Sequence, residues 1–484
     1  MSLSGALSNA LSGLTSSSRL ADVAASNISN AMTEGYGVRQ AVLAPRSAGD
    51  EGGVQVLGIT RMVDKILISD RRKLEAELAY ASTGETFFTR MQRAVGLPDE
   101  AGSLSDRIAQ LEASLAEATR APESAPQLLA VTSNLASVAE HLNTLGRAVQ
   151  TERMRADSDI GTQVESLNSA LQQIEKLNKS IQRHVVLDHD VSAMLDQRQA
   201  LVDQVGKIVP VTEIDRPNGA IALMTRGGQF LLDGKAVAVS FSETATITAH
   251  MTLSGGTLSG LEIDGRAVDT GSSSSAIAGG TLQGLFDVRD DSSVELQAKL
   301  DGFARDLIER FEDPSVDVTL AATAPGLLTD GGAKFNSADE TGLAQRIEMN
   351  ALVDPAQGGQ VWRLRDGLGA ASQGPEGRSA LLIRLSGALT DQAIPSSGAF
   401  SGTARTAATL AADLNSHIGS SLELAEQVLV FSQVQYDSLK QLELAGGVDT
   451  DAEMQRLLII EQAYAANARV VETIDEMLDW LMRI

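Results

Sequence analysis

Apolar residues recur at alternating steps of three and four near both ends of the chain. In the N-terminal segment they are Leu3, Leu7, Ala10, Leu14, Ala21, Ala24 and Ile28. In the C-terminal segment they are Leu457, Ile460, Tyr464, Val471, Ile474, Leu478 and Leu481. Ser17 and Asn467 are the polar members of the two series. This spacing is typical of the seam of a coiled coil, so we predict one amphipathic helix at each end.

Two helices of this kind favour a structural subunit that assembles through its ends. Ordering roughly 30 residues costs about 1–2 kcal/mol per residue in backbone entropy. Each large apolar side chain contributes roughly 1.5–3 kcal/mol when it is fully buried, so one helix alone is expected to be unstable. We hypothesise that both ends are mobile in the free monomer and become ordered on assembly. The alternative is an ordinary intramolecular hairpin that is stable by itself. The candidate interface residues are Leu3, Leu7, Leu11, Leu14, Ile28, Leu457, Ile460, Tyr464, Val471, Ile474, Leu478 and Leu481.

Between the ends, the pattern predicts long helices interrupted by a β-rich insert. An extended loop or hairpin is expected over 38–59. Helices are expected over 60–95, 103–120, 122–182, 190–208, 292–312, 340–349, 379–389, 404–445 and 451–483. Alternating runs among Gly, Thr and Ser residues predict short antiparallel strands over 220–225, 236–241, 245–253 and 258–263. The stretch 271–280 is predicted to be a flexible Ser/Gly connection, and Gly446 and Gly447 a hinge.

The predicted fold class is multidomain and mainly α, with terminal coiled-coil helices, a long helical bundle and an inserted small antiparallel β domain. The expected N-terminal helix and loop, 1–59, pair with the C-terminal helix, 447–484. The helical middle domain is expected in two parts, 60–209 and 286–446, with the β-rich domain inserted at 210–285. A chain nested in this way begins and finishes at the same end of the molecule.

The composition and charge of the chain exclude several classes of binding partner and of chemistry. The 484 residues carry a net charge of −24, which argues against nucleic acid and disfavours an anionic membrane surface. The absence of cysteine excludes thiol catalysis and disulfide scaffolds. No stretch reaches the roughly 18 apolar residues that span a bilayer. The first basic residue is Arg19, so no Sec-type signal peptide is expected.

No motif indicates an enzyme, so we predict no catalytic residue, no cofactor and no metal site. The segment from Gly228 to Lys235 resembles a phosphate loop, but its glycines are one residue too far apart and Ala236 replaces the required hydroxyl. A turn between two strands is expected there instead. His184 and His189 are five residues apart and are expected in a polar turn between helices. Neither Gly-x-Ser-x-Gly nor Ser-x-x-Lys occurs. The pair Asp290 and Asp291 is expected to be a solvated cap, not a glycosidase pair.

The stretch Ala24–Ala31, with Gly35 and Tyr36, lies near the end of the predicted N-terminal helix. It is similar to the run Ala-Asn-Asn-Ile-Ser-Asn-x-x-Thr-Pro-Gly-Tyr of one family, the axial proteins of the bacterial flagellum, which are its rod, hook and hook-associated proteins. At the C-terminus, Glu461–Val470 resembles its Gln-x-Ala-Tyr-x-Ala-x-Ala-Arg-Val signature. Ser26 and Glu34 stand where the family usually has Asn and Pro, and Thr450 replaces a common Leu. The stretches Leu195–Asp203 and Gly284–Asp290 resemble those of the hook-associated members.

The resemblance implies a structural subunit that joins hook to filament. It implies as partners further copies of the chain in a ring, the hook protein, a second junction protein on the filament side, and an export chaperone. The implied location is extracellular, at the hook–filament junction, after type III export without a cleaved signal peptide. Another axial protein of the hook or rod is an alternative. Two further alternatives are an adhesin that binds through 211–284 and a cell-wall hydrolase on a rod scaffold. The small number of aromatic residues in the insert, Phe230 and Phe241, argues against the adhesin, which needs an exposed aromatic platform.

Overall fold

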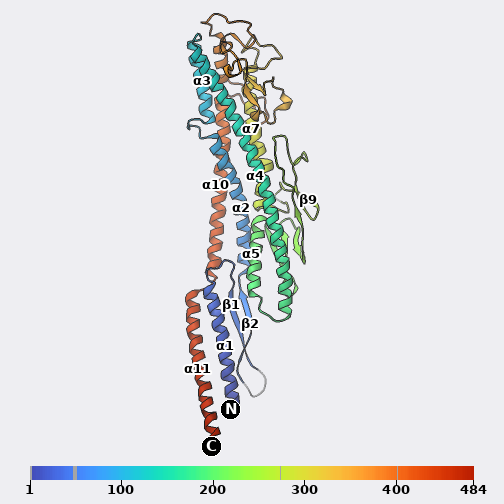
Figure 1. Cartoon of the computed structure of the whole chain (residues 1–484), viewed down its shortest axis with the longest axis vertical. Coiled ribbons are helices and arrows are strands. Elements are labelled where there is room, and N and C mark those ends of the chain that lie inside the picture. The colour runs from blue at the N-terminus through green and yellow to red at the C-terminus, as the bar shows by residue number, and fades with distance from the viewer. Residues whose placement is uncertain (1–2, 47–51, 273, 401, 484) are drawn as a thin grey trace.

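The computed structural model describes residues 3–46, 52–272, 274–400 and 402–483. The molecule is an elongated rod whose long helices run along its axis, and both ends of the chain lie at the same tip (Figure 1). Helices dominate and the strands form small antiparallel sheets, which confirms the predicted mainly α class. Within the described ranges, no helix carries an apolar stretch that could span a bilayer.

The helices of the rod include one that is exceptionally long. They are α1 (Leu3–Ser29), α2 (Lys65–Val95), α3 (Leu104–Arg120), α4 (Ala125–Val186), α5 (Ser192–Ile208), α6 (Thr281–Asp287), α7 (Ser293–Glu312), α8 (Arg363–Asp366), α9 (Ala380–Thr390), α10 (Ala407–Ala445) and α11 (Thr450–Met482). A π-helical turn, Val288–Ser292, joins α6 to α7. With 62 residues, α4 is roughly 90 Å long at 1.5 Å per residue and forms the spine of the molecule.

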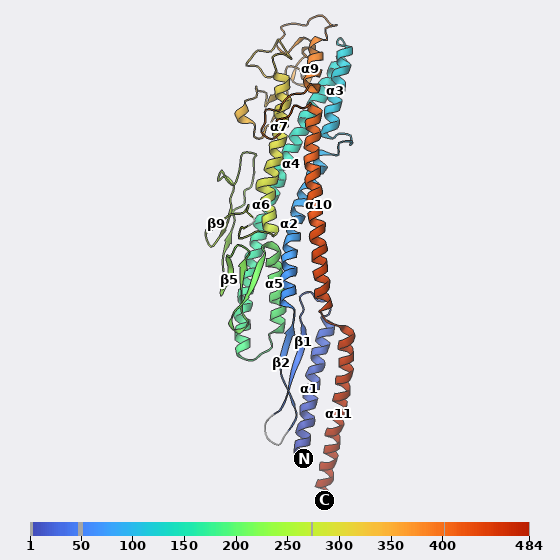
Figure 2. The same ribbon diagram turned by 180° about the vertical axis from the view of Figure 1, so that it is seen from behind.

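The core of the bundle follows the apolar stripe of α4. Its upper half buries residues at alternating steps of three and four, namely Leu128, Val131, Leu135, Val138, Leu142, Leu145 and Val149. Along α4 as a whole pack α2, α3, α5, α6 and α7, and α10 packs along α2 and also contacts α3 and α7 (Figure 2). The apolar periodicity of this part of α4 therefore matches the face that is buried.

In the part of the chain that the structure describes, the strands form four separate small sheets. Near the N-terminus, β1 (Val38–Pro45) pairs with β2 (Val54–Met62) in a hairpin. The insert holds a sheet of β3 (Val211–Asp215), β4 (Ile221–Thr225), β5 (Phe230–Asp233) and β6 (Lys235–Ala236), and another of β7 (Val239–Ser240), β8 (Leu261–Ile263) and β9 (Arg266–Val268). A last pair is β10 (Leu328–Asp330) with β11 (Ile347–Met349). The turn at Gly234 joins β5 to β6, which confirms a strand turn in place of a phosphate loop.

Two asparagines of α4 hold the insert against the bundle. Asn168 donates to the carbonyl of Val239 at 2.7 Å and accepts from its N–H at 3.0 Å. Asn178 does the same with Ile221, at 2.8 and 3.3 Å. Asn168 thus satisfies the backbone of the edge strand β7, and Asn178 that of Ile221 in the inner strand β4, at a position that β5 does not pair.

Several predicted boundaries are wrong, for identifiable reasons. The second helix begins at Lys65, not at 60, because the Asp64 carboxylate caps it and 60–62 belong to β2. No strand forms over 245–253, since the buried Arg153 guanidinium binds the carbonyls of Thr248 and Met251. The predicted run 236–241 divides between two sheets.

Two further predictions fail in the C-terminal half of the insert and beyond it. The expected helix over 340–349 is a single 3-10 turn followed by β11, whose partner β10 is distant in sequence. The Ser/Gly stretch 271–280 was expected to be a flexible connection, yet its apolar residues Ile277 and Ala278 are buried. The helix expected over 292–312 is confirmed as α7, Ser293–Glu312, and the short helix α6 and the π-helical turn precede it.

Candidate assembly surface and the joint that orients it

The two terminal helices lie side by side and antiparallel within one chain (Figures 1 and 2). On α11, Ile460 and Ile474 are buried, and Leu457 and Val471 are half-buried on the same face. This arrangement is the intramolecular hairpin that we weighed as the alternative to mobile ends. Whether the pair persists in a dilute monomer stays a prediction.

A close approach between the helices sets their register. A Cβ atom on Gly13 of α1 would lie 2.7 Å from the side-chain amide of Asn467 on α11. Only a glycine leaves room for that side chain at this height. A polar residue in an otherwise apolar seam favours one register over others. The two helices are therefore expected to pair in a single alignment.

The predicted interface residues divide between covered and open positions. On α1, Leu3, Leu7, Leu14 and Ile28 are half-buried, whereas Leu11 is 58% exposed. On α11, Tyr464, Leu478 and Leu481 are exposed although they belong to the seam that faces α1. Along α11 the seam is thus covered at Ile460 and Ile474, open at Tyr464 between them, and open again beyond Ile474. Only the open positions are available to another molecule.

A second apolar row on α11 was not predicted, and we call it the outer seam. Its members are all exposed: Ile459, Ala463, Ala466, Val470, Thr473, Met477 and Trp480. They repeat the alternation of four and three, one residue before the seam that faces α1, so they lie about 100° around the helix from it. The sequence contained this signal, because the second row has the same spacing as the first. Ile459 is 66% and Trp480 74% exposed, which is unusual for side chains of this size.

The β1–β2 hairpin covers another face of α1. The Ser12 hydroxyl accepts from the N–H of Val54 at 3.3 Å, and the Ser16 hydroxyl donates to the Val54 carbonyl at 3.5 Å. In both views α1 lies between α11 and the hairpin. The hairpin exposes apolar side chains of its own, among them Leu43 and Leu57. The terminal unit therefore has α1 in the middle and an apolar surface on each flank.

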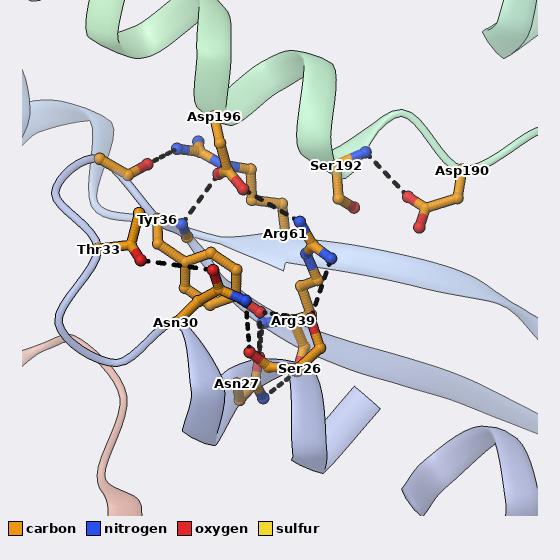
Figure 3. A network of polar contacts seen from close by, with 12 residues as sticks. Ser26, Asn27, Asn30, Thr33, Tyr36, Arg39, Arg61, Asp190, Ser192 and Asp196 are labelled. Atoms are coloured by element: carbon orange, nitrogen blue, oxygen red, sulfur yellow. Dashed lines mark hydrogen bonds and ion pairs between the residues drawn. The ribbon is translucent and has the colours of Figure 1, made fainter. Parts of the chain in front are cut away.

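At the other end of α1, Asn27 clamps the turn that leads into β1 (Figure 3). Its Nδ2 donates to the Arg39 carbonyl at 2.9 Å, and its Oδ1 accepts from the Arg39 N–H at 3.0 Å. The Tyr36 hydroxyl donates to the same Oδ1 at 2.9 Å. The Asn and Tyr of the N-terminal stretch that resembles flagellar axial proteins therefore act together in one turn.

Asp196 of α5 ties this turn to the helical bundle. Its carboxylate accepts from the Gly37 N–H at 3.0 Å, from Arg61 at 2.6 Å and from Arg39 at 3.3 Å (Figure 3). Arg61 also donates to the side chain of Gln199, one turn along α5. The Asp196 and Arg61 side chains are 16% and 9% exposed, so the contact is largely shielded from water. The stretch Leu195–Asp203 thus supplies the bundle side of a polar joint.

A second group of ion pairs lies next to this joint. Arg71 of α2 pairs with Glu75 at 2.6 Å, with Asp203 of α5 at 2.8 Å and with Glu443 of α10 at 2.5 Å. Burial by itself lowers the pKa of Arg71, but the attraction of these three carboxylates outweighs it and raises the pKa above its ordinary value. Lys440 of α10 likewise bonds Glu34 in the α1–β1 turn and lowers the pKa of Glu34. Charged groups from four segments thereby fix how the terminal unit meets the bundle.

The other residues considered for chemistry have structural roles. Asp290 pairs with the buried Arg289 at 2.7 Å, so it is not half of an open carboxylate pair. Phe241 is half-buried and packs edge-on against Phe286, so it offers no flat exposed platform. His184 lies near the end of α4, with its ring centroid 5.7 Å from that of the other histidine in the turn. Among the described residues, no three His, Cys, Asp or Glu side chains are grouped to hold a metal ion.

Comparison with known proteins places these features in a family. The model described as the flagellar hook-associated protein FlgK helical domain matches residues 89–315, and that of the flagellar basal body rod FlgEFG protein C-terminal matches residues 445–484. Flagellar hook-associated protein 1 of Salmonella typhimurium is 25% identical over 284 residues, covering 56% of this chain and 50% of that protein. The same-named protein of Bacillus subtilis is 22% identical over 495 residues, covering 94% of this chain and 93% of that protein.

A solved structure, the flagellar hook junction protein FlgK from Burkholderia pseudomallei, is 19% identical with a TM-score of 0.43, covering 54% of this chain and 47% of that one. The chain spans about half the length of the Salmonella relative that it matches. The Bacillus relative matches it almost from end to end, and the two family models match the bundle and α11. The chain is therefore similar to flagellar hook-associated protein 1, over the bundle and α11 by the family models and almost from end to end by the Bacillus relative.

Proposed function

We propose that this chain is a structural subunit of the bacterial flagellum that joins the hook to the filament. The outer seam of α11 is the observation that carries the proposal. It is a helix-long apolar row that stays exposed although the neighbouring face of α11 is covered by α1. An exposed apolar row of this length marks a protein–protein contact. The similarity to hook-associated proteins supports the flagellum as the place where that contact is made.

The proposed partners follow from the family and from the shape of the molecule. Further copies of the chain form a ring, with the hook protein on one side and a second junction protein and the filament on the other. An export chaperone binds the chain before type III export, which takes place without a cleaved signal peptide. The assembled protein is extracellular. Having both termini at one tip of the rod suits a unit whose terminal helices lie near the axis while the bundle points outward.

The proposed domain plan has a terminal unit, a bundle and an insert. The terminal unit pairs 1–59 with 447–484, and the hairpin supports extending its first part to Met62. The two parts of the bundle, 60–209 and 286–446, flank the β insert at 210–285. The joint around Asp196 connects the terminal unit to the bundle. In this plan the interface residues predicted on α1 and α11 build the terminal unit, and the outer seam makes the external contact.

Electron microscopy of hooks from cells that lack the chain tests the proposal. Such hooks should carry no filaments, and expression of the unchanged chain should restore them. A chain with Ile459→Asp and Val470→Asp should be exported but should not restore filaments, because two charges would be buried in the contact. Leu129→Asp is the matched control, since it charges an exposed leucine of the bundle. Normal filaments on hooks that lack the chain, or with the outer-seam variant, would contradict the proposal.

A further inference from the structure

We infer that the outer seam of α11 in one subunit packs against the β1–β2 hairpin of the neighbouring copy. This inference rests on the proposed function and names the surface that a second copy recognises. It assigns one head-to-tail contact between subunits, made by two different surfaces of the same terminal unit. Four features of the structure support it: the order of the layers, their heights along the rod, their charge and their exposed apolar side chains.

The order of the layers supplies two different apolar flanks. In Figure 1 α11 lies on one side of α1 and the hairpin on the other, and the view from behind in Figure 2 shows the same order. Ile459 and Leu458 are exposed on the α11 flank. Leu57 and Leu43 are exposed on the hairpin flank, with Leu57 at 55%. Two exposed flanks on opposite sides of one unit can each be covered by a neighbour.

A closed ring requires a contact of this kind. Rings form from heterologous contacts, in which one surface of each subunit meets a different surface of the next. A contact of outer seam with outer seam would be isologous instead. It would close after two subunits and would leave both hairpins uncovered. The pairing of α11 with the hairpin covers both flanks with one repeated contact.

The heights of the two flanks along the rod agree. Val54 contacts the hydroxyls of Ser12 and Ser16, which flank Gly13, and Gly13 faces Asn467, so Val54 and Asn467 lie at similar heights. Leu57 lies three residues further along β2, which is roughly 10 Å toward the joint.

On α11 the same 10 Å corresponds to about seven residues in the direction of the joint, which leads from Asn467 to Ile460. A second pair of contacts supports this comparison of heights along the helix and along the strand. Asn27 binds Arg39, which is paired with Arg61 across the hairpin. From Gly13 to Asn27 is about 21 Å along the helix, and from Val54 to Arg61 about 23 Å along the strand. In a ring without axial rise, Leu57 of one copy therefore meets Ile459 of the next.

The charge of the two surfaces permits the contact. The whole chain carries a net charge of −24, so most pairs of surfaces would repel each other. Strands β1 and β2 contain no acidic residue, and their arginines, Arg39 and Arg61, are engaged by Asp196. The members of the outer seam are all uncharged, although several acidic residues flank it on α11. The paired strands β1 and β2 are thus a surface that α11 can approach without facing carboxylates of these strands.

Disulfide cross-linking tests the inference directly, because the natural chain has no cysteine. A chain carrying both Leu57→Cys and Ile459→Cys is expressed in cells that lack the natural one, and isolated hook–filament structures are oxidised. A ladder of multimers on a non-reducing gel is expected, since every copy carries both halves of a head-to-tail contact. A bond within one chain is excluded by α1, which separates the two positions. The matched control is Leu129→Cys with Ile459→Cys, which should give no ladder.

Other outcomes overturn the inference or the function on which it rests. Dimers formed by Ile459→Cys alone would show an isologous contact of two outer seams and would overturn it. A ladder that forms with Val470→Cys but not with Ile459→Cys would overturn the equal-height register. Filaments of normal number without any cross-link would also overturn it, while the proposed function would stand. Absence of the unmodified chain from purified hook–filament structures would instead contradict the proposed function.

Discussion

Replacing Asp196 with alanine should loosen the joint between the terminal unit and the bundle. The carboxylate accepts from the Gly37 N–H at 3.0 Å and from Arg61 at 2.6 Å, and its side chain is 16% exposed. Each hydrogen bond to a charged group contributes about 1.5–3 kcal/mol, and partial exposure reduces this value. We expect the free energy of opening the joint to fall by about 2–4 kcal/mol.

Amide hydrogen exchange over 30–40 measures this opening. Because about 1.4 kcal/mol corresponds to a factor of ten, exchange of the protected amides should become roughly 30- to 700-fold faster. Asp215→Ala is the matched control, since that carboxylate pairs only with Lys65 at an exposed site and should matter by less than about 1 kcal/mol. Equal exchange rates in the Asp196 and Asp215 variants would refute the view that Asp196 holds the joint.

Three further changes should affect pairing and stability. Gly13→Ala should weaken the α1–α11 pair by about 1–3 kcal/mol through overpacking, which limited proteolysis of α11 measures. Gly419→Ala, whose new Cβ would meet no atom within 4 Å, should instead stabilise its helix by up to about 1 kcal/mol, which thermal unfolding measures. Arg289→Met should cost about 3–5 kcal/mol in urea unfolding, because it leaves the carboxylate of Asp157, 1% exposed, without its ion pair. Burial raises the pKa of Asp287 to about 6, so the folded state binds the proton more tightly than the unfolded state does. This carboxyl should therefore make the wild-type chain more stable as the pH falls through 6 toward 4. Asp287→Asn should remove that gain, which unfolding measured at several pH values tests.

Each of these expectations has a contrary result. Unchanged proteolysis in the Gly13 variant would show that the neighbouring side chain moves away without cost. A loss no larger than that of Arg120→Met, which removes an exposed ion pair, would contradict the role of Arg289. An identical pH dependence in the Asp287 variant and the wild-type chain would show that this carboxyl does not titrate near pH 6.

Local signals predicted the helical framework well. The cap at Ser103, the proline in the first turn of α4 and the apolar spacing along α4 are each set by residues within a few positions. Such signals depend on the periodicity of a single element, so no knowledge of the fold is required. The stretch 38–59 was predicted to be an extended loop or a hairpin, and it is a hairpin whose second strand runs on to Met62.

Long-range contacts explain what could not be predicted. The outer seam overlaps the first seam with an offset of one residue, and sequence alone does not say which row faces α1. The joint links Asp196 to Gly37, 159 positions away, and no periodicity connects them. The stretch around Thr248 alternates like a strand, but a buried arginine from α4 binds its carbonyls. In each case the deciding partner lies far away in the sequence.

The fluorescence of Trp480 tests the central claim most directly, because this residue ends the outer seam and is 74% exposed in the single chain. Trp362→Phe leaves Trp480 as the only tryptophan. If the outer seam is covered by another subunit, emission should shift to shorter wavelength and quenching by iodide should fall when the chain is incorporated into hook–filament structures. Emission and quenching that stay the same in the assembled structure and in the free chain would contradict the claim.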